Sequence, residues 1–165
     1  MAQNLSIKEL ESRFRGVLVR LPAIAGNEVV NFALDNFKKQ GFQGDTFQAW
    51  KPRKRNTKWN TNIREGRSIL VKSGQLRRSI RITQINTQSV TVGSNVPYAK
   101  THNEGLRIGQ IQTVNSFTRK NGQQVKSHTR RVDQRIPARP FLAQSQYLTA
   151  KLKRVITTEI MKALR

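Results

Sequence analysis

An excess of positive charge is the strongest constraint that this sequence places on fold and function. Thirty-one lysine and arginine residues stand against nine aspartate and glutamate residues, so the 165-residue chain has a formal net charge of +22. Residues 46–132 hold eighteen of the basic residues and two of the acidic ones, which alone contributes +16. Such a chain repels its own copies unless an anionic partner is near, and nucleic acid is the commonest such partner.

Length and composition indicate one domain with a modest core. A chain of 165 residues can bury enough surface to fold without a metal or a disulfide. Only 36% of the residues are hydrophobic, so we expect long polar excursions around a small core. The absence of cysteine excludes disulfides, thiolate metal sites and cysteine catalysis. The sequence shows no pattern of a transmembrane helix or signal peptide, so no membrane partner is expected.

The N-terminal segment, residues 6–40, predicts helix. Ser6 followed by Glu9 fits a capping box, and apolar residues then recur at helical spacing. Pro22 falls inside this pattern, so we expect either a helical hairpin or one kinked helix. Gly41 is expected to end it.

The remaining segments predict loops, short strands and a final helix. Residues 42–68 follow no period and mix Gly, Asn and Thr with basic residues, which indicates a long basic loop. Residues 69–135 begin with a short helical turn and continue as short alternating runs, which favour antiparallel strands with a turn at 86–88. The segment 141–164 predicts a helix whose apolar face holds Leu148, Leu152, Val155, Ile156, Ile160 and Leu164.

A second pair of extended segments spans residues 106–132 around Asn121 and Gly122, a strong hairpin signal. Its flanks look polar on both faces, so we expect this ribbon to project as an arm. Over 1–165 the sequence therefore predicts a single α+β domain. Its N- and C-terminal helices pack on a small, mostly antiparallel sheet, with long basic loops and a projecting β-hairpin.

Residues with catalytic chemistry do not converge in this sequence. His102 has only Glu104 near it, and His128 lies among basic residues, so neither belongs to a metal-ligand set. The nine acidic residues are scattered singly, and no phosphate-binding glycine loop or nucleophile elbow occurs. We therefore predict no enzymatic activity, no metal and no cofactor.

Nucleic-acid contact is supported by charge and by little else. Zinc-finger spacing and an aromatic RNA-binding pattern are missing, so contact would be to phosphate and blind to sequence. Trp50 and Trp59 stand among basic residues and could stack on bases. The interpretation that we favour makes Trp50 a buried anchor for its loop and Trp59 a half-exposed one.

Four short motifs follow one another in a fixed order. They are W-x-P at 50–52, L-x-x-S-G-x-L-x-x-S-I at 70–80, V-x-V-G-S…P-Y-A-x-x-H-x-x-G at 90–105, and I-P-A-R-P-F-L at 136–142. This order resembles the phage virion morphogenesis family, which includes the tail-completion proteins of Mu-like phages and related head–tail connector and neck proteins. The resemblance covers about residues 50–165. The chain departs from the pattern in its length between Gly105 and Ile136.

The resemblance implies a structural virion protein without an active site, which completes the tail or joins it to the head in the neck. Such a protein would be assembled in the host cytoplasm as a homo-oligomeric ring around the DNA passage. Neighbouring connector and tail proteins are its expected partners, and DNA in the channel is a further candidate. The motif residues would specify the fold and an assembly surface: Trp50, Ser73, Gly74, Leu76, Ser79, Ile80, Tyr98, His102, Gly105, Pro137, Arg139, Pro140, Phe141 and Leu142.

Several of these residues also have a physical rationale. Tyr98 and His102, four positions apart, would share one face of a short helical turn. Arg139 stands between two prolines, which fixes its backbone and could aim its guanidinium at a carboxylate or carbonyl. Phe141 and Leu142 are expected to fill the core where the last helix begins.

Exposed basic residues are the candidates for contact with a partner or with DNA. They lie in the predicted loop and in the arm: Arg53, Lys54, Arg55, Lys58, Arg119, Lys120, Lys126, Arg130 and Arg131. The alternative function, which charge alone would favour, is a ribosomal-like or nucleoid-associated protein of the cell that binds the phosphate backbone without sequence specificity.

Overall fold

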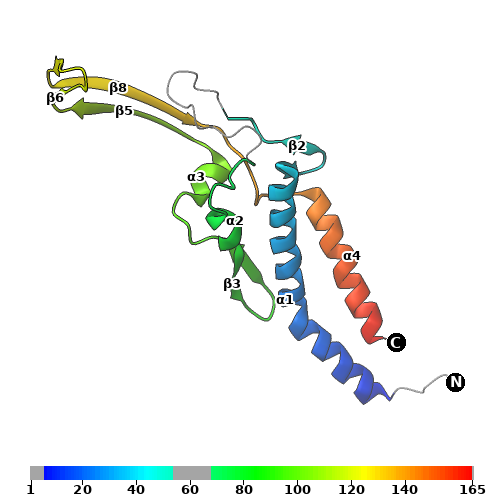
Figure 1. The fold of residues 1–165 in the computed structure, drawn as a ribbon. Helices are drawn as coiled ribbons and strands as arrows, with labels where there is room; N and C mark the ends of the chain where they lie inside the picture. Colours follow the sequence, from blue (N-terminus) through cyan, green and yellow to red (C-terminus); the bar gives the residue numbers. More distant parts are fainter. Residues whose placement is uncertain (1–5, 54–67, 165) are drawn as a thin grey trace.

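The computed structural model describes residues 6–53 and 68–164. Two helices, α1 (Ile7–Lys39) and α4 (Gln146–Ala163), lie side by side and antiparallel along one side of the molecule (Figure 1). Short helices and β-hairpins flank them, and a long β-ribbon extends away from this body. The architecture is α+β, as predicted. The strands form four separate two-stranded antiparallel sheets instead of one small sheet.

Helix α1 begins with the predicted capping box. The Ser6 hydroxyl accepts a hydrogen bond from the Glu9 backbone N–H at 3.3 Å, and the Glu9 carboxylate accepts one from the Ser6 N–H at 3.0 Å. Pro22 lies inside the helix, which bends in Figure 1 and continues as one helix, so the helical hairpin is excluded. The predicted stop at Gly41 is wrong by one residue, because Gln40 takes the left-handed conformation with φ 57°.

The predicted loop at 42–68 contains a hairpin. Strands β1 (Gly41–Gln43) and β2 (Phe47–Ala49) pair antiparallel, and an added Cβ at Gly41 would lie 2.6 Å from the backbone carbonyl oxygen of Gln48. Close packing between the two strands therefore favours glycine at position 41. The rest of this segment from residue 54 to residue 67 lies outside the described residues.

The central hairpin packs on α1 through a glycine. Strands β3 (Arg81–Ile85) and β4 (Val90–Gly93) pair antiparallel with one irregularity in register, around the turn predicted from the sequence. A Cβ at Gly26 of α1 would lie 2.7 Å from side-chain atoms of both Ile82 and Val90. The missing side chain thus lets the hairpin and the helix approach closely.

Helix α4 starts later than predicted, at Gln146 instead of residue 141. Ser145 caps it by accepting a hydrogen bond from the Leu148 N–H at 3.1 Å. The Nζ of Lys151 on α4 lies 2.7 Å from a carboxylate oxygen of Glu28 on α1, and this ion pair joins the two helices. The predicted apolar face is only partly covered, since Leu148, Leu152, Val155, Ile156 and Ile160 are half-buried and Leu164 is exposed.

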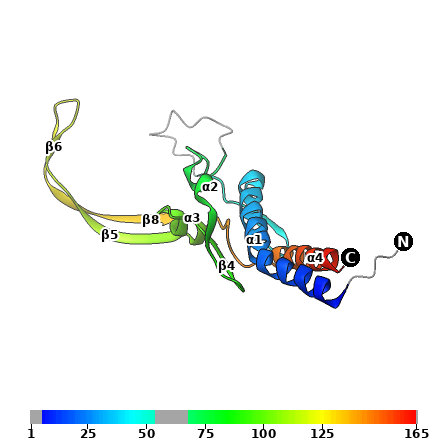
Figure 2. The same cartoon turned by 90° about the horizontal axis from the view of Figure 1, so that it is seen from below.

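The arm is a two-stranded ribbon that leaves the body at its root and curves toward its tip (Figure 2). Strand β5 (Leu106–Val114) pairs with β8 (His128–Ile136) over nine residues on each strand. Two-residue strands, β6 (Phe117–Thr118) and β7 (Gln124–Val125), continue the pairing toward the tip. There Gly122 adopts φ 83°, as the predicted turn requires.

The length and composition of α1 are sufficient for a membrane-crossing helix. One 18-residue window in it has a mean hydropathy of 1.3, and 28% of that window is buried inside the protein. A core helix passes the same test, and α1 packs against α4 and both short hairpins. The prediction that this chain has no membrane partner stays a prediction.

Candidate functional site

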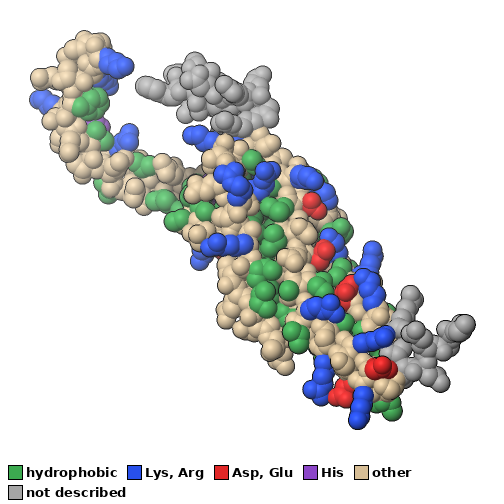
Figure 3. Space-filling view, turned by 60° about the horizontal axis from the view of Figure 1, so that its bottom comes forward, with side chains coloured by type: hydrophobic (Ala, Val, Ile, Leu, Met, Phe, Trp, Pro, Cys, Tyr) green, Lys and Arg blue, Asp and Glu red, His purple; other side chains and the backbone are tan. Residues whose placement is uncertain are grey.

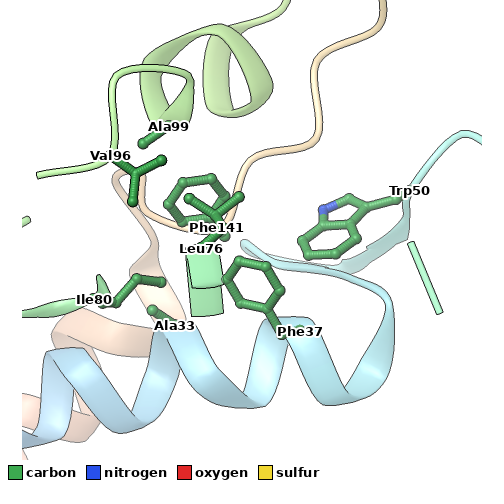
Figure 4. Close-up of a cluster of buried hydrophobic side chains, with 8 residues drawn as sticks. All are labelled: Ala33, Phe37, Trp50, Leu76, Ile80, Val96, Ala99 and Phe141. Atoms are coloured by element: carbon green, nitrogen blue, oxygen red, sulfur yellow. The ribbon is translucent and has the colours of Figure 1, made fainter. Parts of the chain in front are cut away.

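Residues from all four sequence motifs meet in one buried cluster, the motif junction. Figure 4 shows this cluster beside α1, with Trp50, Leu76 and Phe141 arriving from three different segments of the chain. The eight buried members are Ala33, Phe37, Trp50, Leu76, Ile80, Val96, Ala99 and Phe141. The motifs therefore build the core that holds the two short helices α2 (Gln75–Ser79) and α3 (Ala99–Glu104) against α1.

Trp50 anchors the segment that follows β2, as favoured from the sequence. Its side chain is buried, and its ring lies edge-on to Phe37 with centroids 5.4 Å apart. The indole Nε1 donates a 2.8 Å hydrogen bond to the carbonyl oxygen of Pro140. Trp59, the other candidate for base stacking, lies outside the described residues.

Arg139 joins the last motif to the first. Its Nε and Nη2 donate to the carbonyl oxygen of Lys51 at 3.0 and 2.9 Å, so the predicted carbonyl partner is present. The residue is only 7% exposed. Burial and the nearby Arg53 lower the pKa of Arg139. A buried guanidinium bound by carbonyls keeps its full positive charge, because carbonyl oxygens satisfy hydrogen bonds without neutralising it.

Helix α3 places Tyr98 and His102 together, as their spacing predicts. Their rings meet edge to face with centroids 5.7 Å apart. Gly105 ends the helix with φ 79°, and an added Cβ there would lie 2.8 Å from the Ala138 backbone nitrogen. Glycine is therefore needed both for its conformation and for the close approach of the last motif.

Two asparagines that sequence reasoning missed complete the junction. Asn103 accepts hydrogen bonds from the N–H groups of Phe141 and Leu142 and donates to the Leu142 carbonyl at 2.8 Å. Asn36, which is 1% exposed, donates to the Phe141 carbonyl and accepts from the Gln43 N–H. The shared partner segment at 141–142 lies far from both asparagines in sequence, so only the helical position of Asn36 on a buried face could have suggested its role.

The second motif forms a tight turn and a short helix. Gly74 precedes α2 with φ 72°, and Leu76 is buried in the junction. The Ser79 and Ser94 hydroxyl oxygens lie 2.6 Å apart, which links α2 to the segment after β4. Ser73, by contrast, is exposed and contributes its hydroxyl to a local turn with the Gln75 N–H.

A basic pocket opens beside the motif junction, with a volume of about 390 Å³. Its polar wall is formed by Arg53, Lys72, His102 and Arg139, and its apolar wall by Ile69, Leu70 and Leu76. The lining contains no Asp or Glu among the described residues. The lining thus draws on the second, third and fourth motifs, and Leu76 belongs to both the pocket and the motif junction.

Backbone geometry beside the pocket is unusual. Leu70 adopts φ 61°, the left-handed region that a branched side chain rarely takes. Ile69, the residue before Leu70, is held by two hydrogen bonds to the Gln40 side chain. The Gln40 side-chain oxygen accepts from the Ile69 N–H, and its Nε2 donates to the Ile69 carbonyl. Gln40, which follows the end of α1, therefore holds this part of the pocket lining in place.

The arm has two different faces, which corrects the expectation that it is polar on both. Because side chains alternate along a strand, paired residues share one face. One face carries a discontinuous apolar stripe of Leu106, Ile108, Val114, Val132 and Ile136, together with the polar residues Gln110, Gln112, His128, Arg130 and Gln134. The opposite face carries Arg107, Arg131, Arg135 and Asp133. The stripe is difficult to recognise in the sequence, because Ile111 lies on the charged face and interrupts the alternation of apolar and polar residues.

Positive charge on the arm is nearly unopposed. The only ion pair within it joins Arg107 to Asp133 at 3.3 Å, and both side chains are largely exposed. On the face shown in Figure 3, the arm displays basic side chains while the acidic ones lie over the helical body. The candidates Arg119, Lys120, Lys126, Arg130 and Arg131 are all exposed on the arm.

A family model described as the phage virion morphogenesis family matches residues 20–164. The chain belongs to the phage virion morphogenesis family. No curated protein and no solved structure matches it.

The match spans the motifs, which cover about residues 50–165, and it also includes most of α1, the helical segment that precedes them. A role in virion assembly follows from membership of the family. The motif junction of this morphogenesis protein is its folded core, while the arm and the basic pocket are surfaces that the rest of the described chain leaves open.

The predicted partner-facing residues that the structure describes lie at two separate places in this morphogenesis protein. Arg53 lies at the basic pocket, the five arm residues lie on the ribbon, and Lys54, Arg55 and Lys58 lie outside the described residues. Within residues 6–53 and 68–164, no three side chains of the metal-binding types come together. The absence of a metal, a cofactor and catalysis remains a prediction from the sequence.

Proposed function

We propose that this protein completes the tail or joins it to the head, in the neck of a tailed phage or phage-like particle. The observation that carries the proposal is the arm. Nine paired residues on each strand leave the body, and neither face of the ribbon is covered by the rest of the described chain. An isolated two-stranded ribbon is marginal in water, so its stable setting is against a neighbouring molecule.

A ring of copies around the DNA passage fits the charge of the chain. Like-charged subunits can lie side by side only when hydrophobic contacts and anionic neighbours offset their repulsion. The exposed half of α1 offers apolar side chains for such contacts: Ile7 is 85%, Leu18 43% and Val19 71% exposed. Family membership supports this virion role over that of a cellular nucleic-acid-binding protein.

The arm is expected to bind protein in preference to DNA. The free backbone edges of its strands can pair with a strand of a partner protein. Such pairing fixes the orientation of the partner, in addition to the attraction between opposite charges. DNA in a passage must slide, and tight phosphate contacts would hinder it. The acceptor would therefore be a connector or tail protein with an acidic surface. Assembly in the host cytoplasm follows from the same proposal.

The test removes the arm without disturbing its root. Because Gln112 faces Arg130 in the ribbon, replacing residues 113–129 by Asn-Gly should close the shortened strands with a two-residue turn. We expect the variant to unfold at the temperature of the wild type but to be missing from purified particles, which would lack infectivity. Full infectivity would contradict the proposal.

A matched control separates length from charge. A second variant keeps the full arm and replaces Arg119, Lys120 and Lys126 at its tip by glutamine. If this variant is incorporated only in part, and if its incorporation reaches the wild-type level at low salt, the partner surface is acidic. Low salt strengthens the attraction of the remaining basic residues to such a surface. Ring formation is measured separately, from the mass of the purified protein and from its symmetry in electron micrographs of particles.

A further inference from the structure

We propose that the basic pocket binds a carboxylate group presented by another virion protein. The shared chemistry is a carboxylate beside an aliphatic group, from either an acidic side chain or a C-terminus. The proposal depends on the proposed function only for the identity of the partner. Its test uses the isolated chain, so the pocket and the neck position can fail separately.

The first observation is a buried charge without a described counter-charge. Arg139 is 7% exposed, yet its partners in the described structure are the carbonyl oxygens of Lys51 and Pro52. Its Nη1 makes no hydrogen bond to a described residue. A guanidinium offers donors in a planar fork that fits both oxygens of a carboxylate, so this side chain retains binding capacity toward the pocket.

A second observation is an unsatisfied nitrogen in the same lining. His102 Nδ1 is fully buried and has no hydrogen-bond partner among the described residues. Buried polar atoms nearly always have a partner, so an orphan atom beside a cavity points to a ligand that supplies one. His102 and Arg139 line the same pocket, and burial, followed by the charge of Arg139, lowers the pKa of His102.

The third observation is the mixed lining of the pocket. Lys72 is exposed and adds positive charge, while Leu76 is apolar and only 3% exposed. A small cavity with an apolar wall and a few converging cations suits a peptide side chain. Duplex DNA is a poor fit. The phosphates of a duplex contact arginines at the protein surface, whereas the Arg139 side chain is almost fully covered by the protein.

The experiment follows the ring nitrogens of His102 and the Nε of Arg139 by NMR. Two carboxylate probes distinguish the sources: acetyl-Leu-Glu-amide carries the side-chain carboxylate, and acetyl-Leu-Leu carries a free C-terminus. The corresponding uncharged peptides, acetyl-Leu-Gln-amide and acetyl-Leu-Leu-amide, are their controls. We expect saturable shifts with at least one carboxylate peptide and none with its control. Equal shifts with the charged and uncharged peptides would overturn the proposal.

Variants then test the site itself. Lys72→Gln should weaken binding about tenfold, because it removes one charge at the rim. Lys100→Gln, an exposed change on α3 outside the pocket lining, should leave binding unchanged. Equal loss in both variants would show only general attraction to a basic protein. Neither change removes a buried side chain, so both proteins are expected to fold.

Two further outcomes exclude other occupants. Displacement of the peptide by a 12-base-pair duplex at stoichiometric amounts would identify a nucleic-acid site and overturn the proposal. Glu65 lies outside the described residues and is a carboxylate of this same chain. Tenfold tighter peptide binding by Glu65→Gln would show that the chain fills its own pocket, whereas unchanged affinity would support an external carboxylate.

Discussion

The indole nitrogen of Trp50 and the carbonyl oxygen of Pro140 form a 2.8 Å hydrogen bond between residues ninety positions apart. This bond connects the segment after β2 to the segment before α4 at the centre of the motif junction. Together with the hydrogen bonds from Arg139 to the Lys51 carbonyl, it joins the first motif directly to the last. The first and last motifs thus act as one structural unit.

Trp50→Phe should destabilise the protein by about 1–3 kcal/mol. The phenyl ring can still pack near Phe37, but the buried Pro140 carbonyl loses its donor. Urea unfolding gives the free-energy change. Phe117→Leu on β6, where the side chain is 49% exposed, serves as the control and should change stability by less than about 0.5 kcal/mol. A Trp50→Phe variant as stable as the wild type would mean that the hydrogen bond contributes nothing.

Phe141→Ala should cost roughly 3–5 kcal/mol, because it empties the middle of the core. The Phe141 side chain is 2% exposed, and its ring centroid lies 5.2 Å from that of Phe37. Phe117→Ala on the arm removes the same atoms from a residue that is 49% exposed, so its cost should be much smaller. Similar unfolding free energies for the two variants would contradict the core assignment. Leu142, predicted with Phe141 as core, is only partly buried.

Stability should fall as the pH drops below about 6.5, in part through His102. Burial, followed by the charge of Arg139, lowers the pKa of His102 from 6.5. The unfolded chain then binds the proton more readily, so the contribution of the neutral imidazole is complete above about pH 6.5 and declines as the pH falls toward the folded-state pKa. Urea midpoints measured at intervals from pH 7.5 to pH 5 should show the decline.

Substitution of each histidine in turn identifies the source of that decline. His102→Gln should flatten the dependence of the urea midpoint on pH over this interval. His128→Gln, on the exposed arm, should leave the slope of the wild type. If the two variants have the same slope, His102 is not the group responsible.

The purified protein is predicted to lack nuclease activity. Its nine acidic residues are scattered along the chain, and most described ones lie on the helices, away from the arm. Supercoiled plasmid with Mg²⁺ or Mn²⁺ should therefore remain intact over several hours. Cleavage that a chelator stops, and that an Asp133→Asn or Glu104→Gln change abolishes, would show that the assignment as a structural protein is wrong.

Features that depend on neighbouring residues were predictable from the sequence. The Ser6–Glu9 capping box, the turn between β3 and β4, and the Asn121–Gly122 hairpin each depend on residues within a few positions. Phe141 and Arg139 were also assigned correctly, because the prolines beside them restrict the backbone. The end of α1 was misplaced because Gln40 adopts a conformation usually taken by glycine.

Features that depend on distant residues were not predictable. The apolar stripe of the arm appears only when the register is known, since Val132 contributes to it from the second strand. Asn103 satisfies backbone groups thirty-eight and thirty-nine positions later, and nothing near it in the sequence indicates this. The basic pocket likewise assembles residues from four segments, whose meeting depends on the complete fold.

The root of the arm has a mechanical consequence. Nine residues of β-strand extend roughly 30 Å, so the tip amplifies any rotation at the base of the ribbon. A tilt of about 10° at the root would move the end of the ribbon by roughly 5 Å, about the spacing between two adjacent strands. Gly105 lies at this pivot, where the Ala138 backbone leaves no room for a Cβ. A side chain at position 105 would push against the Ile136 and Ala138 backbone, so even a small residue there would tilt the whole ribbon.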